Sequence, residues 1–100
     1  MKTPEYLDVD PRTLHLPPSR ASGADPDKLA RQIAQYGSAI QGMPPPWVYR
    51  GADGALMIYD GVTRATRVAT LLPRRLIQVE VVGDLPAACG HLPTIGDYVP

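Results

Sequence analysis

Hydrophobic and polar residues follow one another along the chain in a pattern that predicts short strands and two helices. Alternating, β-branched or aromatic segments typical of strands occupy residues 6–10, 47–50, 55–59 and 76–82. The Gly-Ala-Asp-Gly segment at 51–54 favours a hairpin between the middle two strands. Trp47, Tyr49 and Tyr59 alternate on this hairpin, and we expect them to pack in the core or at its rim.

The first helix is predicted between Asp25 and Gly37. Asp25 is a favourable N-cap, and Pro26 suits the first helical position. Leu29 and Ile33 supply an apolar stripe, and Gly37 is a natural C-terminal stop.

The second helix is predicted over residues 62–72, before Pro73. Its apolar residues recur at helical spacing, at Val62, Ala65, Val68, Ala69 and Leu72. The element order of strand, loop, helix, hairpin, helix and strand indicates an α+β fold, with helices packed on a small mixed sheet. We assign the domain to residues 1–83 and expect residues 84–100 to form a tail that wraps over it or is partly disordered.

Composition limits the classes of function. One hundred residues with 44% hydrophobic content suit one folded domain. Ten basic residues balance ten acidic residues, so we expect duplex DNA binding to be weak or absent. No apolar run reaches about 18 residues, so no membrane association is expected. The single Cys89 cannot form an internal disulfide, which fits a cytoplasmic protein.

The junction between the third strand and the second helix is the strongest candidate site. Gly61 permits a sharp turn, after which the first N–H groups of the helix, from Val62, Thr63 and Arg64, can face an anion. Arg64 adds a planar charged group suited to phosphate, and Arg67, one turn later, is expected to face the same ligand. An ordinary strand-to-helix turn with solvated arginines remains the alternative.

Two acids are candidates for catalysis. Asp60 lies directly before the turn and could hold Mg²⁺ or act as a base, and Asp10 follows the first strand. The alternatives are that Asp10 opens an Asp-Pro turn and that Asp60 braces its own turn through backbone hydrogen bonds. Both histidines lie in loops without metal-ligand spacing, so neither is assigned a role.

The element order, together with Asp-Gly-Val-Thr-Arg at 60–64, resembles the N-terminal domain of the ParB/sulfiredoxin superfamily over residues 6–82. The resemblance includes an extended Pro-Ser-Arg loop at 18–20 and Gly-Met-Pro-Pro at 42–45. In that family the Gly-x-x-Arg motif holds the phosphates of a nucleotide. The resemblance therefore implies a nucleoside triphosphate as ligand or substrate, and it adds Arg20 to the candidate phosphate-binding residues.

Departures from the family narrow its activities. Sulfiredoxins have a working cysteine where this chain has Val62, and free-serine-kinase-like relatives have a histidine there. Partition proteins of the family continue into a helical DNA-binding domain that we do not expect here. Three functions stay open: nucleotide or phosphate binding, with phosphoryl transfer or hydrolysis; a nuclease or toxin effector with a cognate immunity or partner protein, similar to ParB-like domains of polymorphic toxins; and a non-catalytic interaction module. A homodimer is compatible with each of them.

Overall fold

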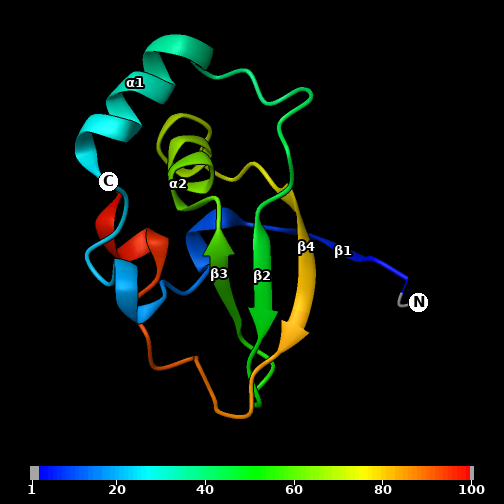
Figure 1. Ribbon diagram of the computed structural model, residues 1–100. Helices are drawn as coiled ribbons and strands as arrows, with labels where there is room; N and C mark the ends of the chain where they lie inside the picture. The colour runs from blue at the N-terminus through cyan, green and yellow to red at the C-terminus, as the bar shows by residue number, and fades with distance from the viewer. Residues whose placement is uncertain (1–2, 100) are drawn as a thin grey trace.

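A computed structural model describes residues 3–99, which form a four-stranded mixed sheet and two helices (Figure 1). The elements in chain order are β1 (Glu5–Val9), α1 (Pro26–Tyr36), β2 (Trp47–Arg50), β3 (Leu56–Asp60), α2 (Val62–Leu71) and β4 (Ile77–Asp84). The strand order is β1-β4-β2-β3, with β2 parallel to β4 and the other neighbours antiparallel. The predicted α+β fold with a mixed sheet is therefore confirmed.

Residues 3–99 also contain three short 3₁₀ helices: η1 (Pro11–Thr13), η2 (Pro18–Arg20) and η3 (Ile95–Tyr98). None of the helices within residues 3–99 has the length and hydrophobicity needed to cross a bilayer.

Local sequence explains where α1 begins and ends. The Asp25 carboxylate accepts hydrogen bonds from the backbone N–H groups of Asp27 and Lys28, at 2.8 and 3.3 Å. Pro26 occupies the first turn, and Gly37 ends the helix with a φ of 54°. The predicted boundaries of this helix are confirmed.

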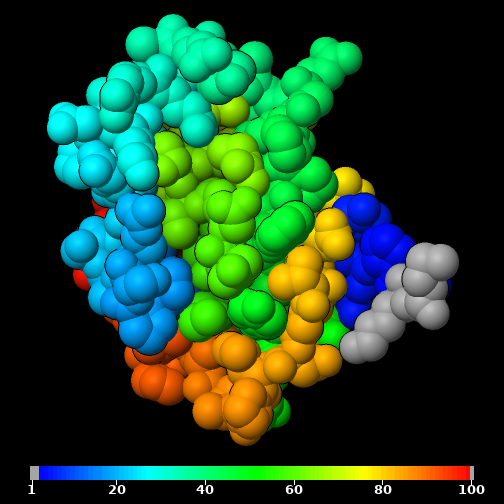
Figure 2. Space-filling model, viewed as in Figure 1, coloured from blue at the N-terminus to red at the C-terminus, as the bar shows by residue number. Residues whose placement is uncertain are grey.

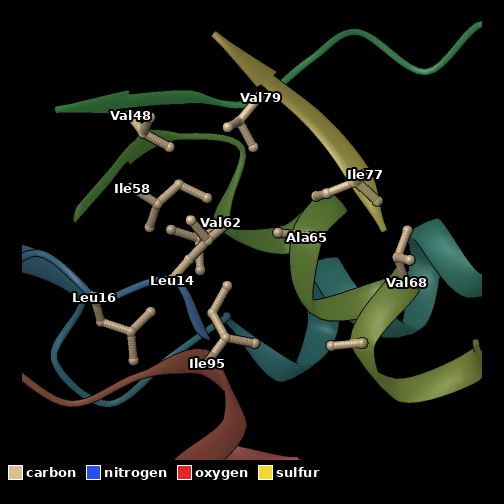
Figure 3. Packing of buried hydrophobic residues seen from close by; sticks show 11 residues of the cluster. Leu14, Leu16, Val48, Ile58, Val62, Ala65, Val68, Ile77, Val79 and Ile95 are labelled. Carbon is tan, nitrogen blue, oxygen red and sulfur yellow. The ribbon is translucent and has the colours of Figure 1, made fainter. Parts of the chain in front are cut away.

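The core lies between the sheet and α2, where side chains from both point toward each other (Figure 3). Its buried members come from α2, from three strands, from the segment between η1 and η2, and from η3. They are Val62, Ala65, Val68, Ala69, Val48, Ile58, Ile77, Val79, Leu14, Leu16 and Ile95. The predicted apolar stripe of α2 thus supplies four of its members. In contrast, α1 has no fully buried residue and packs against α2.

The fourth strand continues through the glycine that we expected to end it. β4 runs to Asp84, and Gly83 pairs with Tyr49 of β2. A Cβ at Gly83 would lie 3.0 Å from a ring carbon of Tyr49, so the glycine makes room for that ring.

The C-terminal segment is part of the same core. Ile95 is buried in the main cluster, and the backbone N–H of Leu16 donates to the carbonyl oxygen of Pro93 at 2.7 Å. The Asp53 carboxylate in the hairpin accepts N–H bonds from Gly90 at 2.9 Å and Cys89 at 3.3 Å, and these bonds lower the pKa of Asp53. The segment after residue 83 therefore contacts the core through Ile95 and the hairpin through Asp53.

Arg67 joins the two helices. It is only 2% exposed, and its guanidinium donates to the carbonyl oxygens of Gly37 at 2.6 Å and Ala39 at 2.8 Å. Its Nε donates to the side-chain oxygen of Gln32 at 3.2 Å, and the guanidinium lies 5.4 Å from the centre of the Tyr36 ring. A buried cation at the C-terminal end of α1 also has a favourable interaction with the helix dipole.

Replacing Arg67 should destabilise the whole domain. Arg67→Ala is expected to lower the free energy of unfolding by about 3 kcal/mol, because it leaves two carbonyl groups without their donor and opens a cavity. Arg67→Lys keeps the charge but not the planar fork, so it should recover only part of this loss. Urea unfolding measures both variants. Arg75→Ala, at an exposed position, serves as a control. An unchanged urea midpoint for Arg67→Ala would contradict a stabilising role for Arg67.

Candidate functional site

Gly61 produces the sharp turn from β3 into α2. It has a φ of 102° and a ψ of 23°, a conformation that other residues rarely adopt. Gly61 is the N-cap of α2 and makes no side-chain cap, so no side chain of the cap residue covers the first N–H groups of the helix. The positive end of the helix dipole is therefore directed to this point, as the sequence indicated.

A pocket of about 290 Å³ lies at this helix start. Its walls come from η2, α1, the end of β3 and the first turn of α2, and they consist of Ser19, Arg20, Lys28, Gln32, Tyr59, Asp60, Gly61, Val62, Thr63 and Arg64. In Figure 2 the light-blue region that contains η2 adjoins the green surface of β3 and α2, with α1 in cyan above it. The fold thus brings five sequence-predicted residues of the helix start, together with Arg20, to one hollow.

The charges of the pocket are mostly positive. Arg20, Lys28 and Arg64 come from three different elements, and Asp60 is the one carboxylate among the described lining residues. Arg64 Nη2 lies 3.7 Å from an Asp60 oxygen, with the side chains 25% and 60% exposed. The Nε of Arg64 is buried and has no hydrogen-bond partner among the described residues.

The side chain of Val62 packs in the core and offers no polar group to the pocket. It belongs to the buried core cluster, so only its backbone is suited to a ligand. Thr63 and Arg64 are the first α2 residues whose polar side chains line the pocket.

Two sequence-predicted residues have other roles. Arg67 was expected beside Arg64 on the phosphates. Both arginines line a neighbouring pocket of about 320 Å³, but the Arg67 guanidinium donates to the end of α1 and does not line the pocket at the helix start. One helical turn separates the two arginines, yet Arg67 lies on the buried side of α2, and the carbonyl groups there hold it. Asp10 was expected as a catalytic acid, but it is the N-cap of η1, where its carboxylate accepts the Arg12 N–H at 2.9 Å. Asp10 does not line the pocket.

The loop at Arg20 also differs from its prediction. We expected residues 17–20 to be extended, whereas Pro18–Arg20 forms η2, closed by the Arg20 N–H donating to the Pro17 carbonyl at 2.8 Å. Proline at the first position of a helical turn has a suitable φ, which explains the difference. The turn places Arg20 at the pocket.

The acids do not gather as a multi-ligand metal site. Within residues 3–99, no group of three or more His, Cys, Asp or Glu side chains is placed to hold one ion. Asp8 is on β1, at the opposite edge of the sheet from Asp60 on β3, so these two carboxylates do not share one site. Mg²⁺ often binds through one or two carboxylates plus ligand phosphates, and Asp60 fits that mode.

Sequence reasoning missed four residues of the pocket: Ser19, Lys28, Gln32 and Tyr59. Lys28 and Gln32 are four residues apart on α1 and therefore share a face. This spacing in the sequence could have indicated that Lys28 and Gln32 act together. It does not indicate which other element this face of α1 approaches.

Comparison with known proteins gives no family assignment: no family model and no curated protein matches the chain.

A pair of glycine variants tests the turn at Gly61. A Cβ there would lie 2.9 Å from Arg64 Nη2 and 3.0 Å from the Pro46 Cβ, whereas a Cβ at Gly54, with φ of 84°, would meet nothing within 4 Å. Gly54→Val should lower the free energy of unfolding by about 1–2 kcal/mol from backbone strain alone. Gly61→Val should cost at least about 1 kcal/mol more, because it adds crowding against Pro46. Thermal or urea unfolding of both variants gives the comparison, and equal losses would show that crowding is absent.

Proposed function

We propose that the pocket at the start of α2 binds the phosphate of a nucleotide or of another phosphorylated ligand. One observation carries the proposal: three cationic side chains from separate elements line one hollow with the uncapped start of a helix. Helix N-termini and arginine side chains are a recurrent combination in phosphate recognition. Because the whole chain has zero formal net charge, this positive field is local.

The residues of the pocket have distinct roles in this proposal. The N–H groups of Val62, Thr63 and Arg64 face the phosphate oxygens, and the Thr63 hydroxyl adds a further donor. Arg64 supplies a two-pronged contact, and Arg20 and Lys28 close the pocket from the opposite walls. The resemblance of the Gly61–Arg64 motif to the ParB/sulfiredoxin superfamily supports the same assignment.

Asp60 is the candidate for catalysis by this pocket. A carboxylate beside bound phosphates would repel them unless Arg64 or Mg²⁺ offsets its charge. With Mg²⁺ bound by Asp60 and phosphate oxygens, the ion would supply charge stabilisation for hydrolysis or phosphoryl transfer. We propose this step as conditional on Mg²⁺, with Asp60 as the metal ligand.

Arg64→Ala is expected to weaken binding of ADP or pyrophosphate at least about tenfold, because a charged hydrogen bond to phosphate is worth about 1.5–3 kcal/mol. The fold should change little, since Arg64 contributes charge and not core packing. Isothermal calorimetry measures the affinity, and circular dichroism checks the fold. Arg75→Ala removes an equal charge from an exposed loop and should bind as the wild type does. Equal affinities for Arg64→Ala and Arg75→Ala would remove the pocket assignment.

Asp60→Asn separates the metal role from simple charge. Without Mg²⁺, this variant should bind ADP as well as or better than wild type, because one repulsive charge is gone. With Mg²⁺, wild type should bind more tightly and the variant should not respond, and any release of phosphate from ATP should fall more than binding does. The measurement is a titration with ADP at several Mg²⁺ concentrations, with phosphate release from ATP followed in parallel. A Mg²⁺ response that survives in Asp60→Asn would exclude Asp60 as the ligand.

A further inference from the structure

An exposed group of aromatic rings adjoins the pocket. Trp47 of β2 and Tyr59 of β3 are 45% and 56% exposed, and their rings lie nearly parallel, with centroids 6.5 Å apart and an angle of 5°. The Tyr49 ring meets Tyr59 edge-on, at 5.3 Å between centroids. These rings were expected in the core or at its rim, but their neighbours Val48 and Ile58 occupy the core instead, so alternation directs Trp47 and Tyr59 to the other side of the sheet.

The aromatic rings are continuous with the candidate phosphate site. Tyr59 lines the pocket and directly precedes Asp60 and Gly61. Trp47 is the cross-strand partner of Asp60, and the β2–β3 register shifts directly after Trp47. Such irregularities change the direction of a side chain and are frequent next to functional sites.

Resting on the proposed function, we propose that the Trp47–Tyr59 pair stacks the aromatic base of the ligand, so that the pocket selects mononucleotides over simple phosphate esters. Stacking needs an exposed, rigid π-face, and Tyr49 fixes the Tyr59 ring by its edge contact. Phosphate recognition needs cationic side chains, and these line the same pocket as Tyr59. A nucleotide combines both groups in one small molecule. The zero net charge of the chain favours a small ligand over a long polyanion.

Trp47 is the single tryptophan of the chain, so its fluorescence reports directly on this surface. We would titrate the full chain with AMP and with ribose 5-phosphate, which carries the same phosphate without a base. AMP should quench Trp47 emission and bind about tenfold more tightly than ribose 5-phosphate, in line with the usual strength of stacking on an aromatic side chain. Ribose 5-phosphate should bind without quenching.

Tyr59→Leu should weaken AMP binding about tenfold and leave the calorimetric affinity for ribose 5-phosphate within about twofold of wild type. Tyr59→Phe keeps the ring and should retain both affinities. Tyr6→Leu, at the opposite edge of the sheet with a similarly exposed ring, is the matched control and should behave as wild type. Melting curves confirm that each variant is folded. If Tyr59→Leu does not fold, the wild-type comparison of AMP with ribose 5-phosphate still tests the proposal.

Equal wild-type affinities for AMP and ribose 5-phosphate would overturn base stacking while leaving the phosphate site in place. Base stacking would likewise be overturned if Tyr59→Leu lost equal affinity for AMP and for ribose 5-phosphate. If AMP, ribose 5-phosphate and pyrophosphate all fail to bind, the proposed function falls, and base stacking falls with it. An oligothymidylate that binds much more tightly than TMP would assign the rings to a nucleic-acid strand and overturn the mononucleotide proposal.

Discussion

The placement of α1 depends on the buried guanidinium of Arg67. Helix α1 buries none of its own residues completely, so hydrophobic packing alone fixes it weakly. Arg67 holds its C-terminal end through the carbonyl groups of Gly37 and Ala39, and the side chain of Gln32 is a further partner. A planar group with five donors can satisfy several acceptors at once, which an ammonium group cannot do with the same geometry.

This constraint determines the shape of the candidate site. One wall of the pocket is α1, which contributes Lys28 and Gln32, and the opposite side is the start of α2. Because Arg67 belongs to α2 and binds the end of α1, it fixes the distance between these walls. Arg64 and Arg67 therefore have different contacts on the same helix. Arg64 lines the pocket, and Arg67 donates to the end of α1, which forms the opposite wall. A loss of ligand binding in an Arg67 variant would therefore reflect the position of α1 and not a contact with phosphate.

The sequence predicted most of the fold because local signals agreed. Asp25 and Pro26 set the start of α1, and Gly37 sets its end. The turn at residues 51–54 produced the hairpin. The errors came from tertiary contacts that no local pattern contains. β4 continues through Gly83 because that residue pairs with Tyr49 of β2, and the inward direction of Arg67 depends on where α1 ends. The motif located the helix start, but Lys28 and Tyr59 joined the site only through packing.

The identity of residue 62 limits what the site can do. The Val62 side chain is buried in the core at the first turn of α2, so the position that carries a thiol or an imidazole in similar motifs here contributes packing. The other groups at the helix start are backbone N–H donors, the Thr63 hydroxyl and cationic side chains, which are suited to donating hydrogen bonds to an anion. In the proposed site, Asp60 is therefore the side chain to which catalysis would fall, because it is the one carboxylate among the described lining residues.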